Sequence, residues 1–142
     1  MTTIMIFVPG PPRGKERPRF HKHAFTPAAT RAAEKDIAWH AQIAMRGKPL
    51  LAGALSVSIS AVYSYPKSWS AKKRAATRWK TSKPDVDNIA KLIDAFGAQR
   101  VKKRRAMVPG IVWTDDASVV VLNVTKMYGA PEGVTYEIQE LL

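Results

Sequence analysis

The sequence contains no cysteine and no long apolar run. The absence of Cys from its 142 residues excludes disulfides, cysteine–zinc sites and thiol nucleophiles. No apolar stretch approaches the roughly 20 residues that a membrane-spanning helix needs, and the run at residues 4–8 is too short for the core of a signal peptide. We therefore expect an untargeted, cytoplasmic protein that has neither a membrane nor a small organic cofactor among its partners.

Acidic residues are also scarce. There are 11 Asp and Glu against 23 Lys and Arg, which gives a formal net charge of +12. Most of the basic residues fall within residues 13–22, 67–83 and 100–105, and such clusters are typical of proteins that bind polyanions. Charge alone leaves open a solvated basic surface or a nonspecific RNA or membrane patch. The candidate DNA-binding residues are Arg13, Lys15, Arg17, Arg19, Lys72, Lys73, Arg74, Lys83, Lys102, Lys103, Arg104 and Arg105.

Length and periodicity predict one domain, residues 1–142, that mixes strands and helices. Hydrophobic residues make up 46% of the chain, which is enough for one core. A chain of 142 residues is too short for two ordinary domains. Alternating and apolar runs predict strands, whereas apolar residues at helical spacing predict helices. Residues 129–133 predict a hairpin connection between the last two strands. The expected strands are residues 3–8, 55–65, 118–127 and 134–141, and the expected helices are residues 30–45, a segment from Asp85 onward and a turn at 71–78.

A helical wheel describes the segment that follows Pro84. At 100° per residue, its apolar side chains form one broad arc that we expect to face the core. Asp87, Lys91 and Asp94 fall side by side along the edge of that arc. The wheel therefore predicts a polar stripe beside the core.

Five of the eleven acidic residues fall between positions 85 and 116 of this basic chain. Carboxylates that are brought together repel one another unless a cation holds them, and their oxygen atoms suit Mg²⁺ or Mn²⁺. A metal ion between such carboxylates and a DNA phosphate can activate water and stabilise the leaving 3′ oxygen. The five residues are Asp85, Asp87, Asp94, Asp115 and Asp116.

Each of these acids also has an ordinary interpretation. Asp85 could serve only as a helix N-cap, and Asp87 and Asp94 could be solvated partners of Lys91. Residues 115–116 could form only a turn between two strands. Taken singly, none of them defines a site.

The order and spacing of these residues resemble a known family. They are similar to the signature of the RusA-like Holliday junction resolvases, and the likeness spans nearly the whole chain. The central residues are Lys83-Pro84-Asp85-Val86-Asp87-Asn88-Ile89-Ala90-Lys91, Asp94-Ala95 and Trp113-Thr114-Asp115-Asp116. The N-terminal residues, which resemble the opening of phage-borne members, are Pro9-Gly10-Pro11-Pro12, Lys15-Glu16-Arg17-Pro18-Arg19-Phe20 and Thr26-Pro27.

The resemblance implies a crossover junction endodeoxyribonuclease. Its fold would be α/β (α+β), a small mixed sheet with two main helices, and the protein would be a homodimer. With Mg²⁺, or Mn²⁺ as a substitute, it would introduce paired nicks across a four-way DNA junction in recombination and repair. Two sites are needed to cut two symmetric strands, and a homodimer supplies them.

The resemblance also implies roles for individual residues. Asp85, Asp87 and Asp116 would be the metal-binding carboxylates, with Asp115 beside them. Lys91 would be the catalytic lysine, placed to contact the scissile phosphate. Asn88 would orient a carboxylate or cap the helix, and Asp94 would have a structural role.

Other interpretations remain open. The basic segment at residues 97–110 is longer than is usual in the family, so a nuclease that also cuts flaps is an alternative. A non-catalytic branched-DNA-binding protein would explain the basic residues but not the acids. A PD-(D/E)xK nuclease lacks the second half of its motif here.

The histidines and tryptophans carry weaker signals. We interpret His21 and His23 as solvated or near a phosphate, and His40 as a helix-face residue, rather than as metal ligands. Trp69 and Trp79 lie among basic residues, and they could pack in the core or stack on an unpaired base.

Overall fold

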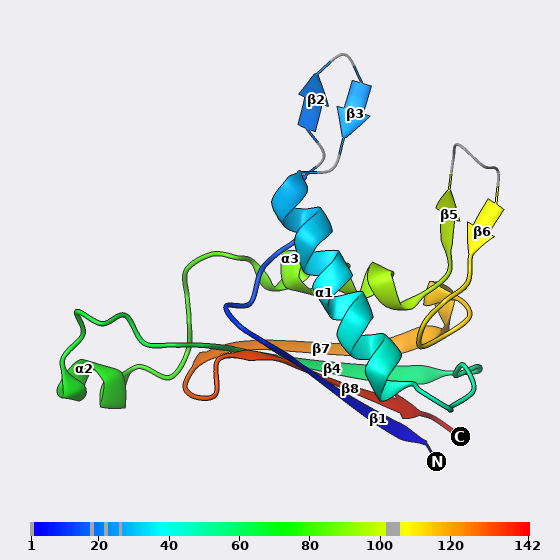
Figure 1. The fold of residues 1–142 in the computed structure, drawn as a ribbon. Helices are drawn as coiled ribbons and strands as arrows, with labels where there is room; N and C mark the ends of the chain where they lie inside the picture. Colours follow the sequence, from blue (N-terminus) through cyan, green and yellow to red (C-terminus); the bar gives the residue numbers. More distant parts are fainter. Residues whose placement is uncertain (1, 18, 22, 26, 102–105) are drawn as a thin grey trace.

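A four-stranded mixed sheet forms the base of the molecule in this computed structural model, which describes residues 2–17, 19–21, 23–25, 27–101 and 106–142 (Figure 1). The strand order is β1-β8-β4-β7; β8 is antiparallel to β1 and β4, whereas β4 and β7 are parallel. The expected mixed sheet is confirmed. Its strands are β1 (Thr3–Pro9), β4 (Leu55–Tyr63), β7 (Val119–Tyr128) and β8 (Gly133–Glu140).

Sequence alternation explains why one face of this sheet is buried. In β4 the apolar residues Val57 and Ile59 are buried, whereas the intervening Ser58 is half-buried on the other face. β1 follows the same pattern, with Ile4 and Ile6 buried. Successive side chains of a strand point to opposite faces, so these patterns place the core on one side of the sheet.

The helices cover only that buried face. α1 (Ala28–Ala44) packs on it through Ile37 and Ala41, and α3 (Val86–Ala90) and the 3₁₀ helix η1 (Lys91–Phe96) lie on the same side (Figure 1). In the described parts of the chain, no helix lies over the opposite face. The sheet therefore has one covered face and one bare face.

Three aromatic side chains fix η1 to the core. Phe96, Trp113 and Tyr136 are fully buried, and the Phe96 ring meets Trp113 and Tyr136 edge-on at centroid distances of 5.4 and 5.0 Å. Trp113 also forms a β-bridge with Leu51. Edge-to-face packing of this kind is favourable beyond the buried area. It holds the segment before β7 against the end of η1.

Two expectations about these elements are wrong. The last two strands do not form a hairpin, because β4 lies between β7 and β8 in the sheet and residues 129–133 connect strands that are not neighbours. The second helix is not one continuous α-helix, because it tightens to 3₁₀ geometry at Lys91. Both differences arise from tertiary packing, which local periodicity does not encode.

The remaining elements project from the sheet and its helices. None of the described helices is long and apolar enough to cross a membrane. Two short hairpins and the helix α2 extend outward in Figure 1. The four basic residues at 102–105, predicted to bind DNA, lie outside the described residues. The projecting elements are β2 (Arg19–His21), β3 (His23–Phe25), β5 (Gln99–Val101), β6 (Ala106–Val108) and α2 (Ala71–Ala76), whereas the 3₁₀ helix η3 (Asp116–Ser118) directly precedes β7.

Candidate active site

The N-terminal loop docks directly on the first turn of α3. The backbone N–H of Lys15 donates to the carbonyl oxygen of Asn88 at 2.8 Å. A Cβ at Gly14 would lie only 2.8 Å from the Cβ of Pro84, so this close approach requires glycine. The two parts of the sequence that carry the family resemblance are therefore in contact.

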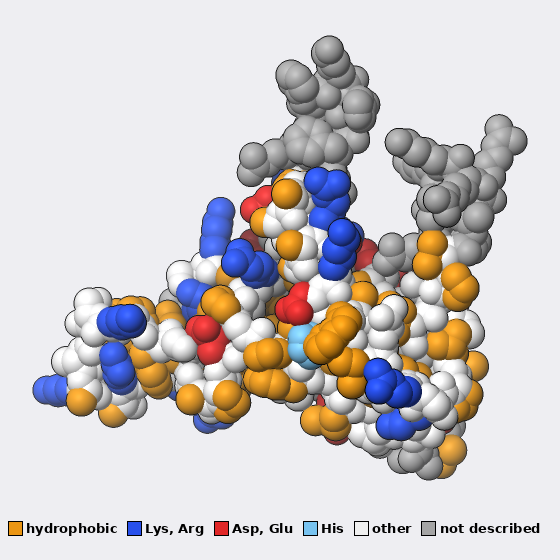
Figure 2. Space-filling view, in the orientation of Figure 1, with side chains coloured by type: hydrophobic (Ala, Val, Ile, Leu, Met, Phe, Trp, Pro, Cys, Tyr) orange, Lys and Arg blue, Asp and Glu red, His pale blue; other side chains and the backbone are white. Residues whose placement is uncertain are grey.

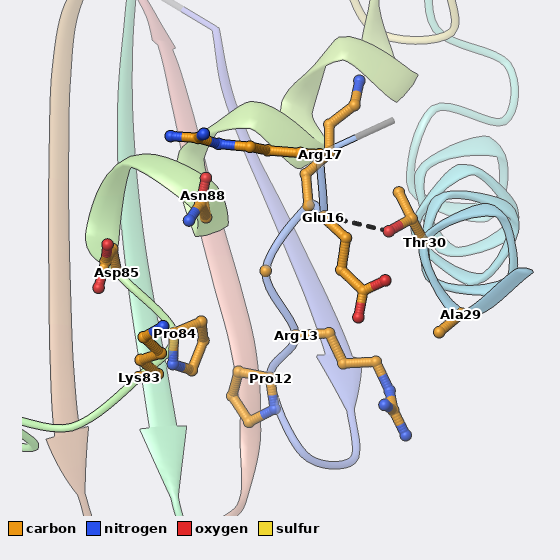
Figure 3. A pocket seen from close by; sticks show the side chains of 12 residues that line it. Pro12, Arg13, Glu16, Arg17, Ala29, Thr30, Lys83, Pro84, Asp85 and Asn88 are labelled. Carbon is orange, nitrogen blue, oxygen red and sulfur yellow. Dashed lines mark hydrogen bonds between the residues drawn. The ribbon is translucent and has the colours of Figure 1, made fainter. Parts of the chain in front are cut away.

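This contact encloses a pocket of about 720 Å³ between the loop, the N-terminus of α1 and the first turn of α3 (Figure 3). The residues that line the pocket include four cations and four residues of the central motif. Such a pocket suits an anionic ligand, because the cations outnumber the acids. The cations are Arg13, Lys15, Arg17 and Lys83, and the motif residues are Lys83, Pro84, Asp85 and Asn88.

Asp85 occupies the N-cap position of α3, yet its side chain makes no capping hydrogen bond. The interpretation of Asp85 as only a cap therefore finds no support in its geometry. Asp87 lies in the first turn, and both carboxylates are exposed. The helix thus presents two carboxylates beside the pocket.

Lys91 lies one turn further along, next to Asp87. Its ammonium is 3.7 Å from Oδ2 of Asp87 and 3.4 Å from Oδ1 of Asn88. The predicted adjacency of Asp87 and Lys91 is confirmed, because the α-helical spacing holds over these four residues. Their side chains remain more than half exposed, so the pair is open to a ligand.

Asp115 and Asp116 lie in the short segment before β7. Oδ1 of Asp116 accepts a hydrogen bond from Nε1 of Trp113 at 2.7 Å, and Oδ1 of Asp115 accepts from the backbone N–H of Ala117 at 2.9 Å. Asp115 therefore caps η3, as the turn interpretation predicts. A Cβ at Gly97 would overlap the Asp116 carboxylate, so this acid lies at the C-terminal end of η1.

The predicted metal-binding acids lie at two positions in the fold. Asp85 and Asp87 lie at the start of α3, whereas Asp116 lies beyond the end of η1. Among the residues described, no three His, Cys, Asp or Glu side chains form a group that could hold a metal ion. The donor chemistry still fits Mg²⁺, which is commonly held by one or two carboxylates together with substrate phosphates and water.

Lys15 was predicted to contact DNA, but it forms two ion pairs inside the protein. Its ammonium is 3.4 Å from Glu34 on α1 and 3.3 Å from Asp94 on η1. Burial lowers the pKa of Lys15, but the hydrogen bond to Asp94 and the charges of Glu34 and Asp94 outweigh burial, so the pKa is raised above its ordinary value of 10.5. Local sequence patterns could not predict this link, because the partners are 19 and 79 positions away.

The other predicted DNA-binding residues lie in separate places. Lys72, Lys73 and Arg74 are on α2, and Arg19 is in β2. The interpretation of His40 as a helix-face residue is confirmed, since it pairs with Asp36 on α1 at 3.3 Å. The pocket and α2 are therefore two distinct basic regions of the described structure.

A mixed sheet covered on one face, with a cation-lined pocket beside paired acids, defines a candidate nuclease rather than a simple basic DNA-binding module. The family model described as endodeoxyribonuclease RusA matches residues 9–139, and the chain belongs to this family. Members of the family hydrolyse phosphodiester bonds in DNA, and the resemblance is confirmed over nearly the whole chain. The search of curated proteins found no match.

Proposed function

We propose that this protein is an Mg²⁺-dependent, structure-specific endonuclease that resolves Holliday junctions by paired, symmetric nicks in DNA recombination and repair. One observation carries the proposal: Asp85 and Asn88 of the family motif line the same pocket as Arg13, Lys15 and Arg17 (Figure 3). A cation-lined pocket binds the DNA backbone, and adjacent carboxylates bind the ion that hydrolysis requires. The net charge of +12 supports a polyanionic substrate.

A few residues of the proposed site have distinct roles. Asp85 and Asp87 would hold Mg²⁺ with the DNA phosphate, and Asp116, with Asp115 beside it, would complete the carboxylate set. Mg²⁺, when bound, activates water and stabilises the oxygen that leaves phosphorus. Lys91 would contact the scissile phosphate and offset negative charge as the P–O3′ bond breaks. Arg13, Arg17 and Lys83 would hold the flanking phosphates.

Lys91 and Asp87 also form a pair that a substrate can rearrange. The two side chains are 3.7 Å apart and exposed, so their mutual attraction is weak in water. A phosphate and a divalent ion offer each of them a stronger partner. The ground-state ion pair therefore keeps the lysine beside the position that the phosphate would take.

A comparison of DNA cleavage by wild type and by the Asp87→Asn variant tests this proposal. The substrates are a labelled four-way junction, a matched duplex and a flap, each with Mg²⁺ or with EDTA. We expect wild type to nick the junction only with metal, and we expect the variant to lose cleavage by on the order of 100-fold or more. Junction binding should persist or tighten, because the variant removes a negative charge.

Two further variants sharpen the test. Asp36→Asn changes an exposed acid on α1 outside the proposed site, and cleavage should be unchanged. Asp116→Asn keeps an oxygen that can accept from Trp113, so it should lose cleavage and still fold. If wild type binds junctions but never cuts them with Mg²⁺ or Mn²⁺, the protein is a non-catalytic DNA binder. Equal cutting of flaps and junctions would indicate a broader branched-DNA nuclease.

A further inference from the structure

Residues 66–83, which we name the basic arm, form a second charged region. The basic arm contains seven Lys and Arg and no acid. Its helix α2 has no buried residue and extends beyond the end of the sheet, where Figure 2 shows Lys and Arg side chains. An exposed element with charge of one sign is suited to binding an anionic partner.

Aromatic packing anchors the arm, and one of its two tryptophans, Trp69, takes part in this packing. The Trp69 ring packs against Tyr65 and Tyr128 at centroid distances of 6.2 and 5.1 Å, and those two tyrosines stack on each other at 5.2 Å. The Tyr65 hydroxyl also donates to the carbonyl of Thr77 at 3.2 Å. Trp69 is therefore a structural residue at the base of the arm.

The backbone at Trp79 is hydrogen-bonded to the sheet, but the Trp79 side chain is exposed. The backbone on either side of Trp79 pairs with β7. The N–H of Tyr128 donates to the carbonyl oxygen of Arg78 at 2.9 Å, and the N–H of Lys80 donates to the carbonyl oxygen of Lys126 at 3.3 Å. The Trp79 side chain nevertheless remains 52% exposed. The guanidinium of Arg78 lies 4.7 Å from the centre of its ring. An exposed indole whose backbone is held by hydrogen bonds to β7, and which has a cation beside it, is suited to stacking on a nucleobase.

The arm is also tied to the candidate active site. The ammonium of Lys126 donates to the carbonyls of Ser82 at 2.7 Å and Pro84 at 2.8 Å, and Asp85 follows immediately. The six residue steps from Trp79 to Asp85 can span at most roughly 20 Å. The backbone of Trp79 therefore lies within this distance of the start of α3.

We propose that the basic arm binds unpaired nucleotides at the branch point of DNA, with Trp79 stacking on a base and the surrounding Lys and Arg holding the flanking phosphates. This inference rests on the proposed action on branched DNA. It assigns recognition of the branch to the arm, because bases in a fully paired duplex have no free face for an indole. The pocket beside α3 then has only the phosphodiester to position.

A second copy of this chain is the competing occupant of Trp79. Residues opposite each other in an antiparallel bridge point to the same side, so Trp79 lies on the side of Met127 at the bare face of the sheet. Pairing two copies there would bring two arms, each with seven cations and no acid, toward each other. Their repulsion disfavours this contact and favours DNA.

The test compares Trp79→Ala and Trp79→Phe with Trp39→Ala. Trp39 is a matched control, because it is 57% exposed but lies on α1 against His40. The probes are a four-way junction with 2-aminopurine beside the branch point and a duplex with the same label. We expect Trp79→Ala to weaken junction binding about ten-fold, with Trp79→Phe intermediate and duplex binding within about two-fold. The change in 2-aminopurine fluorescence on binding should disappear only in Trp79→Ala.

Each outcome separates this inference from the nuclease proposal. If Trp79→Ala keeps the wild-type preference for junction over duplex, the inference is wrong even where Mg²⁺-dependent cleavage is intact. If Trp79→Ala lowers the sedimenting mass instead, Trp79 belongs to an interface between copies and the inference is also wrong. If wild type never cuts DNA but the fluorescence change depends on Trp79, the inference stands and the nuclease proposal fails.

Discussion

Lys15 is a basic residue whose charge acts within the protein. It joins the N-terminal loop to Glu34 on α1 and Asp94 on η1, and its side chain is only 27% exposed. We expect Lys15→Gln to lower the free energy of unfolding by about 1 kcal/mol at neutral pH, because two charge pairs are lost and solvent screens both. Urea denaturation measures this difference.

The pH dependence of that difference follows from the raised pKa of Lys15. A group whose pKa is higher in the folded state stabilises the fold fully below its ordinary value of 10.5. That contribution is lost as the pH rises through the folded-state pKa. The stability difference between wild type and Lys15→Gln should therefore hold below pH 10.5 and shrink as the pH rises above it. A variant that is fully stable but binds DNA poorly would show that Lys15 is a DNA contact instead.

At the scale of elements, the basic arm should contribute to DNA binding without regard to sequence. Each phosphate that a protein neutralises adds about 0.9 to the slope of log K against log salt. We expect the double variant Lys72→Gln, Lys73→Gln to reduce that slope by about 1 to 2, equally for duplex and junction. The control pair Arg46→Gln, Lys48→Gln lies after the C-terminus of α1 and should leave the slope unchanged. An unchanged slope in the arm variant would place DNA elsewhere.

The elements also show which parts of the fold the sequence could predict. β4 and α1 are predictable because alternation and helical spacing directly reflect which face is buried. The order of β7 and β8 is not predictable, because β4 inserts between strands that are adjacent in sequence. The change to 3₁₀ geometry at Lys91 and the ion pairs of Lys15 are set by contacts between distant segments. The motif predicts which residues form the site, but not that Asp116 bonds to Trp113.

At the scale of the whole molecule, the two faces of the sheet differ in charge. The face under α1 and α3 lies toward the cation-lined pocket. On the bare face, the register of the strands shows that Glu137 is the one charged residue among the described strand positions. Met5 and Phe7 are 56% and 41% exposed there. Met5 and Phe7 lie on β1, at the opposite edge of the sheet from β7 and Trp79. In a chain of net charge +12, the bare-face positions of β1 and β8 carry no cation, so this side of the face suits a second copy.

The homodimer that paired nicking requires should therefore form through the β1 side of this face, away from the basic arm, leaving both pockets outward. Met5→Lys tests it, because Met5 lies opposite Glu137 in the sheet and a lysine there can pair with that acid in the monomer. In a face-to-face dimer the same lysine must lose water, so we expect sedimentation to show wild type as a dimer and the variant as a monomer. Ile43→Lys adds the same charge to an exposed apolar position on α1 and should remain dimeric. The monomeric variant should nick one strand of a junction without the paired second nick, and a wild-type monomer that still makes paired nicks would exclude this dimer.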